Sequence, residues 1–159
     1  MAFLDLLQKQ LAHNLDADFD NMGRPGSRGV PFKVTLASHG YTVVGKAVPS
    51  YFERCLQHEA AMYERLQPLQ GRYVPVHLGV VELQHMCCYE GIAVLKSMLL
   101  LGYAGIPILK LPDKSCRLQA LEQAVACAEA VHKLGVLHCD PASRNILWDS
   151  GTKLSLIHI

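Results

Sequence analysis

A short polar run late in the chain constrains the fold more than any other feature. It reads H-C-D-P-A-S-R-N over residues 138–145, and apolar residues flank it on both sides. Asp140 and Asn145 stand five residues apart in what we expect to be a loop between a helix and a strand. This spacing suits phosphoryl transfer, because a carboxylate can accept a hydroxyl proton while an amide oxygen holds Mg²⁺ on nucleotide phosphates.

Composition and charge narrow the class of protein. Half of the 159 residues are hydrophobic and 18% are charged, which is typical of a globular chain that buries a core. The formal net charge is only +1, so nothing indicates a nucleic acid or an anionic membrane as partner. The six cysteines form no C-x-x-C pair, and the N-terminus does not resemble a signal peptide. Both features favour a reducing compartment, the cytoplasm or the nucleus.

The apolar stretch 92–109 is the only one that approaches the length of a membrane span. Lys96 lies within it, Gly102 and Gly105 interrupt it, and Pro107 breaks it. We therefore expect a buried strand that runs into a loop, and not a membrane helix.

The hydrophobic periodicity of the chain predicts an α+β fold. Apolar residues recur at helical spacing in segments 3–15, 52–66 and 117–134, and Gly135 has the position of a helix C-cap. The β-rich runs that predict strands are 32–37, 41–48, 74–83, 92–101, 146–148 and 153–159. Residues 20–31, rich in glycine and proline, predict a loop, and residues 84–91 a connection between two strands. A joint between two lobes is expected near 102–105.

Two charged residues in these elements are candidates for a binding site. Lys46 lies in a predicted strand among mostly apolar neighbours, where an unpaired ammonium would be costly to bury. Glu59 lies thirteen residues later on the next helix, beside its apolar stripe, and is the candidate partner. Glu53 and Glu64 are solvent-facing alternatives. A surface lysine and an ordinary helical glutamate remain the simpler interpretation of the same residues.

These segments resemble the protein-kinase-like superfamily, which includes eukaryotic protein kinases and small-molecule phosphotransferases. V-G-K at 44–46 is similar to the strand motif that offers a lysine to nucleotide phosphates, and L-G-V-L-H-C-D-P-A-S-R-N-I-L is similar to the catalytic loop. The segment 58–80 is similar to a group of kinase-like domains common in fungi. The implied fold is α+β, with an antiparallel N-lobe sheet and one helix, followed by part of a helical C-lobe.

The resemblance implies a nucleotide site with ATP and Mg²⁺ as cofactors. Lys46 and Glu59 would hold the phosphates, and Leu101 and Tyr103, in the linker, would present backbone groups to the adenine edge. The glycines at 23, 26 and 29 precede the first hairpin, where a phosphate-covering loop belongs, but their spacing differs from G-x-G-x-x-G. Pro25 and Pro31 also lack N–H groups. A phosphate contact and a plain connection both stay open for this segment.

The resemblance also implies roles in the catalytic loop. Asp140 would act as the catalytic base or orient the acceptor hydroxyl, Asn145 would bind Mg²⁺, and His138 would support the loop through hydrogen bonds. Arg144 is similar to the A-A-R-N form of tyrosine kinases, whereas Ala142 stands where serine/threonine kinases usually carry a lysine. The acceptor is therefore either a protein hydroxyl or the hydroxyl of a small molecule.

The expected second metal-binding position also departs from the family pattern. A kinase carries its second metal-binding Asp at the end of the next strand, and His158 stands there, a poor ligand for Mg²⁺. We expect a fragment from a truncated gene or transcript, with last residues that need not be native, little transfer activity, and uncovered apolar surface on the helix 117–134. The expected divisions are an N-terminal segment 1–29, an N-lobe 30–101 and an incomplete C-lobe 102–159. The alternatives are a pseudokinase-like binding or scaffold domain and an unrelated α+β domain.

Overall fold

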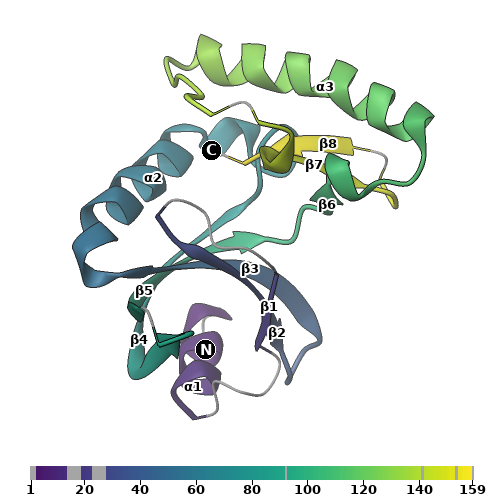
Figure 1. Cartoon of the computed structure of the whole chain (residues 1–159). Coiled ribbons are helices and arrows are strands. Elements are labelled where there is room, and N and C mark those ends of the chain that lie inside the picture. The colour runs from purple at the N-terminus through teal and green to yellow at the C-terminus, as the bar shows by residue number, and fades with distance from the viewer. Residues whose placement is uncertain are drawn as a thin grey trace. The chain divides into compact units, whose positions relative to one another are not determined.

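The computed structural model describes residues 3–13, 19–22, 28–91, 93–140, 142–152 and 154–158, with the side chains of 85–87 excepted. The chain forms an α+β structure that divides into two units (Figure 1). The first unit comprises Met1–Ala60 and Leu78–Gly102, and the second comprises Ala61–His77 and Tyr103–Ile159. Helix α2 (Glu53–Arg65) contributes its first part to the first unit and its last part to the second.

The first unit is built on a five-stranded antiparallel sheet with the strand order β1-β2-β3-β5-β4. Its strands are β1 (Phe19–Asn21), β2 (Val30–Leu36), β3 (Tyr41–Pro49), β4 (His77–Tyr89) and β5 (Ala93–Gly102). The predicted strands at 32–37, 41–48 and 92–101 are confirmed within a few residues. The strand predicted at 74–83 instead runs to Tyr89, so its turn to β5 starts at Glu90 and Gly91, both with positive φ.

Alternation along β3 decides which residues enter the core of this unit. Val43 and Ala47 are buried, whereas Val44 and Lys46 between them are partly exposed on the opposite face. Helix α1 (Phe3–His13) packs on the buried face through its two buried leucines. The strand residues that complete this core are Val30, Phe32, Val34, Leu36, Val81, Leu83, Leu95, Met98 and Leu100.

Strand β1 is a correction to the predicted loop at 20–31. Phe19–Asn21 pairs antiparallel with β2, and β2 itself begins at Val30. Phe19 stacks on Phe32 across the pair, with ring centroids 4.2 Å apart. A three-residue strand carries too little periodicity to be detected locally, and cross-strand packing recruits it into the sheet.

The second unit joins helix α3 (Lys114–Lys133) to a three-stranded antiparallel sheet. The sheet consists of β6 (Ile106–Pro107), β7 (Ile146–Asp149) and β8 (Leu154–Ile157). The helix starts earlier than the predicted residue 117, because the Asp113 side chain accepts a 2.9 Å hydrogen bond from the N–H of Ser115 and caps it. The buried stripe of α3 consists of Ala120, Ala124, Cys127 and Val131.

Gly135 follows α3 with a φ of +74°, so the predicted C-cap glycine is confirmed. Gly105 has a φ of +94°, and a Cβ there would lie 2.1 Å from the carbonyl oxygen of Trp148. Glycine therefore allows the chain to pass close to β7 within the second unit.

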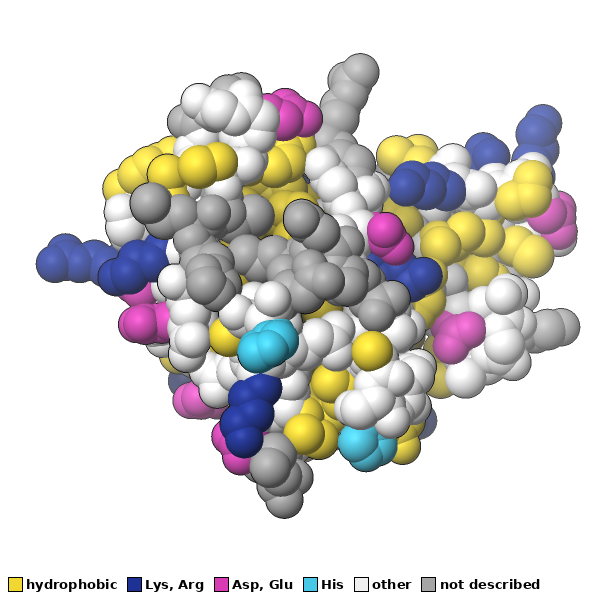
Figure 2. All heavy atoms as spheres, turned by 90° about the horizontal axis from the view of Figure 1, so that it is seen from below, with side chains coloured by type: hydrophobic (Ala, Val, Ile, Leu, Met, Phe, Trp, Pro, Cys, Tyr) yellow, Lys and Arg dark blue, Asp and Glu magenta, His cyan; other side chains and the backbone are white. Residues whose placement is uncertain are grey.

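None of the helices in the described ranges has both the length and the apolar character needed to cross a membrane. The apolar stretch at 92–109 contains the buried strand β5, as predicted, but the expected loop after it includes the short strand β6 and the start of a 3-10 turn at Ile108–Lys110. Figure 2 shows one face of the molecule, on which hydrophobic, acidic and basic side chains are interspersed, in keeping with the net charge of +1.

Candidate functional site

Lys46 and Glu59 form an ion pair within the first unit. The Nζ atom of Lys46 lies 2.5 Å from Oε2 of Glu59, and the two side chains are 25% and 15% exposed. Strand β3 holds Lys46 opposite Leu99 of β5, and helix α2 holds Glu59. The carboxylate compensates an ammonium that would otherwise be costly in this partly buried place. The structure therefore places Glu59, the expected partner, beside Lys46.

The environment of Glu59 acts on its titration in two opposing ways. Desolvation by burial raises the pKa of the Glu59 carboxyl above its ordinary value. The charge of Lys46, its hydrogen bond and the charge of Arg28 all oppose that rise without cancelling it. Among the described residues, the charges of Lys46 and Arg28 thus both act on the Glu59 carboxylate.

Glu53 is not the solvent-facing residue that the helix pattern predicts. One of its carboxylate oxygens accepts a 2.8 Å hydrogen bond from the Ser97 hydroxyl, and the other lies 3.9 Å from the Lys96 ammonium. Ser97 is buried on β5, so Glu53 satisfies a hydroxyl that has left water. Glu64 is exposed, as predicted.

The loop between β1 and β2 is described at its two ends. Its start is held by the N–H of Met22, which donates to the carbonyl of Pro31 at 3.0 Å. At its end, a Cβ on Gly29 would lie 2.9 Å from the Ala47 carbonyl oxygen and 3.3 Å from Cγ of Lys46. The third glycine of the segment therefore packs on β3 beside Lys46. Gly23, Pro25 and Gly26 lie outside the described residues.

The side chains of Leu101 and Tyr103 belong neither to the Lys46–Glu59 ion pair nor to the polar network around Asp140. Leu101 is 1% exposed and pairs with Val44 across the β3–β5 ladder. Tyr103, the first residue after β5, is 44% exposed. Backbone contacts of these two residues to an adenine stay a prediction.

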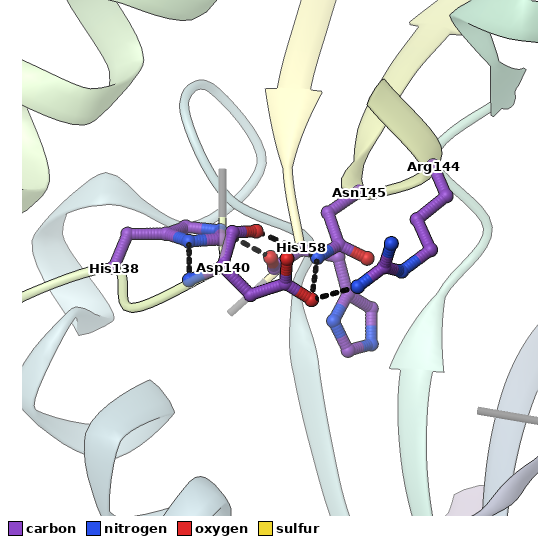
Figure 3. A network of polar contacts seen from close by, with 5 residues as sticks. All are labelled: His138, Asp140, Arg144, Asn145 and His158. Carbon is purple, nitrogen blue, oxygen red and sulfur yellow. Dashed lines mark hydrogen bonds and ion pairs between the residues drawn. The ribbon is translucent and has the colours of Figure 1, made fainter. Parts of the chain in front are cut away.

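Asp140 lies at the centre of a polar network in the second unit (Figure 3). The Arg144 guanidinium pairs with its Oδ2 atom, and the Asn145 side-chain N–H group donates to the same Oδ2 at 3.1 Å. Asn145 also donates to the Asp140 backbone carbonyl at 2.8 Å. Oδ1 of Asp140 accepts no hydrogen bond from any residue that the structure describes. Arg144 and Asn145 therefore fix the Asp140 carboxylate through its Oδ2 atom, and its Oδ1 atom stays available to accept a hydrogen bond.

His138 supports this loop, as predicted. Its Nδ1 atom accepts a 3.2 Å hydrogen bond from the backbone N–H of Asp140, and its Nε2 atom lies 2.6 Å from the carbonyl oxygen of His158. Partial desolvation acts to raise the pKa of the Asp140 carboxyl, but the hydrogen bonds from Asn145 and Arg144 and the charge of Arg144 outweigh it. The net effect lowers that pKa, so Asp140 is ionised at neutral pH.

The donor set around the loop fits Mg²⁺ poorly. The Asn145 side-chain nitrogen is engaged with Asp140, which leaves its Oδ1 atom as an oxygen ligand. His158 offers an imidazole where a second carboxylate is expected, and its ring lies edge-on to Tyr63 with centroids 6.2 Å apart. Mg²⁺ requires hard oxygen ligands in octahedral geometry. Within the described residues, no group of three or more His, Cys, Asp or Glu side chains is arranged to hold a metal ion.

The structure thus brings the predicted site residues together in two pairs, one in each unit. Lys46 meets Glu59 in the first unit, and Asp140 meets Asn145 in the second. Sequence reasoning missed Arg28, whose charge acts on Glu59. The only signal for Arg28 was its place beside Gly29, in a segment already under consideration as a phosphate loop.

The chain was compared with known proteins. No protein-family model matches it. It is similar to the meiotic driver SPOK2 of Podospora anserina, with 31% identity over 153 residues. The match covers 93% of this chain but 19% of that protein, so the chain spans a small part of the relative's length.

Proposed function

We propose that this chain is the nucleotide-binding part of an ATP-dependent phosphotransferase with the protein-kinase-like fold. The Lys46–Glu59 ion pair is the observation that carries this proposal. A lysine on a central strand, oriented by a helical carboxylate and still partly exposed, is placed to meet phosphate oxygens. The acceptor would be the hydroxyl of a protein or of a small molecule.

The order of elements supports the same fold. A helix follows the third strand of an antiparallel five-stranded sheet, and a later helix leads into the polar loop before a strand pair. The chain is similar to a small part of a meiotic driver. By analogy, it would serve as the nucleotide-binding part of a longer protein.

Within the second unit, the loop 138–145 would bind the acceptor hydroxyl. Oδ1 of Asp140 would accept the hydrogen of the acceptor hydroxyl, because Oδ2 is already engaged by Arg144 and Asn145. Asn145 would offer its Oδ1 atom to a metal ion. Because the described donor set fits Mg²⁺ poorly, we expect nucleotide binding with little or no transfer.

Nucleotide binding by the chain tests this proposal. We expect ATP to raise the melting temperature of the wild-type chain, since a ligand that binds the folded state alone stabilises it by mass action. Lys46→Met should remove the shift, whereas Lys96→Met should keep it, because Lys96 is an exposed lysine of the same sheet and pairs with Glu53 instead. A wild-type chain that shows no ATP-dependent shift, and no heat of ATP binding in titration calorimetry, would refute the proposal.

A second candidate function is a non-catalytic scaffold or binding domain. Leu118, Leu121 and Val125 are 61%, 43% and 60% exposed and follow the i, i+3, i+7 spacing of one helix face. Exposed apolar patches of this kind favour association. Leu121→Glu, with Glu122→Gln as control, should reduce self-association or partner capture if this candidate holds.

A further inference from the structure

His77 is held against the ring of Tyr63 within the second unit. The two rings are stacked, with centroids 5.8 Å apart and planes inclined by 27°, and Tyr63 is fully buried. Gln70 fixes this arrangement, because its side-chain amide donates to the carbonyl of Tyr63 at 2.8 Å and accepts from the backbone N–H of His77 at 2.9 Å. Since the two backbones are bridged in this way, movement of His77 is confined largely to its side chain.

The site around the His77 imidazole suits its neutral form. Its Nε2 atom is buried and has no hydrogen-bond partner among the residues that the structure describes. A neutral ring with its proton on Nδ1 leaves only an unpaired acceptor there, whereas a protonated ring would bury an unpaired N–H donor and a positive charge. Because the side chain is partly exposed, a protonated ring can turn out to water, and it leaves Tyr63 when it does.

The charges near His77 agree with this geometry. Desolvation by burial lowers the pKa of His77 below its ordinary value of 6.5. Within the described part of the chain, Glu64 is the charged group whose field reaches His77, and it opposes this effect without cancelling it. Glu64 directly follows Tyr63 on α2. Uptake of a proton by His77 therefore works against the stack in a pH range below 6.5.

Tyr63 joins His77 to the polar loop of the same unit. The ring of Tyr63 meets the ring of His158 edge-on, with centroids 6.2 Å apart. The backbone of His158 holds both ends of the loop (Figure 3). Its N–H donates to the carbonyl of Asn145 at 2.8 Å, and its carbonyl oxygen lies 2.6 Å from Nε2 of His138. A change on the His77 side of Tyr63 can thus reach both ends of the loop through one residue.

We propose that the stack of His77 on Tyr63 is a proton-sensitive support of the loop 138–145. While His77 is neutral, Tyr63 stays in place against His158, whose backbone holds the loop. When His77 takes up a proton its ring leaves Tyr63, and the hydrogen bond from His158 to Asn145 opens more often. The device regulates phosphoryl transfer only if the loop binds the acceptor as proposed above, but the support itself requires no nucleotide.

Amide hydrogen exchange of the full chain, followed by NMR without nucleotide, tests this support. The signal to follow is the backbone N–H of His158, corrected for its intrinsic exchange rate at each pH. In the wild type its protection should fall severalfold as the pH is lowered from about 8 to about 5, with the midpoint of the His77 ring titration. His77→Phe keeps an aromatic ring on Tyr63 without a titrating group, so this step should disappear. Any step that remains should follow the ring titration of His138.

Glu64→Gln distinguishes the mechanism from an effect of His138. It removes the charge that favours protonated His77, so the His77 midpoint and the midpoint of His158 protection should move together to lower pH. His39→Phe, which replaces an exposed histidine of the first unit, is the control and should move neither.

Three results would overturn the proposal. The first is a protection of His158 that does not change with pH in the wild type, and the second is an equal fall in His77→Phe. The third is a protection midpoint that stays in place while the His77 midpoint moves in Glu64→Gln, and this result decides alone if His77→Phe does not fold. None of them bears on ATP binding, whose failure shows separately as a missing ATP-dependent shift of the melting temperature.

Discussion

The Lys46 ammonium lies 2.5 Å from the Glu59 carboxylate, although the two residues are thirteen positions apart and belong to a strand and a helix. Both side chains are largely withdrawn from water. Each charge is tolerable there because the other is present, so the pair couples the position of α2 to that of β3.

Removing one member of this pair should destabilise the fold. Lys46→Met leaves the largely buried Glu59 carboxylate without its counter-ion, and we expect the free energy of unfolding to fall by about 1–3 kcal/mol, less than for a fully buried pair because water still reaches the site. Chemical denaturation measures the change. The double variant Lys46→Met, Glu59→Gln should recover part of the loss, and strictly additive effects would show that the two residues do not interact.

The raised pKa of Glu59 should appear in the pH dependence of stability. A carboxyl that holds its proton more tightly when folded makes the folded state relatively less stable as pH rises from its ordinary pKa of 4.5 through the raised value. The free energy of unfolding of the wild type, relative to Glu59→Gln, should therefore fall across this window and level off above it. A relative stability that rises with pH there would contradict the assigned direction.

Arg144 should keep the pKa of the Asp140 carboxyl below its ordinary value. Arg144→Ala removes a hydrogen bond and a nearby positive charge from the carboxylate, so the Asp140 pKa should rise toward its ordinary value. The titration of the Asp140 side-chain carbon signal by NMR measures it directly. Lys133→Ala, an exposed cation of the same unit, should leave the titration unchanged. An unchanged pKa in Arg144→Ala would mean that the ion pair does not persist in solution.

Gly45 should resist enlargement. A Cβ at this position would lie 2.2 Å from the sulfur of Met98, a fully buried side chain. Gly45→Ala should therefore lower the free energy of unfolding by about 1–3 kcal/mol through overpacking. Combining it with Met98→Val should relieve the clash, so the double variant should lose less than the sum of the two single changes.

Much of the fold could be predicted from local patterns in the sequence. The apolar spacing in α2 and α3, the β-rich runs of β2 and β3 and the glycine after α3 could all be recognised in the sequence, because helices, strands and caps depend on residues close along the chain. The candidate partners Lys46 and Glu59, and Asp140 and Asn145, were also identifiable, since each sits within or beside such a pattern.

Contacts between distant segments were decided only in three dimensions. β1 is a strand because β2 lies beside it, and Glu53 is engaged because β5 brings a buried hydroxyl to it. The place of Gly29 beside Lys46 likewise depends on how the end of the β1–β2 loop packs on β3. Such pairings depend on which side chains and strands meet across the fold, and residue periodicity holds no information about that meeting.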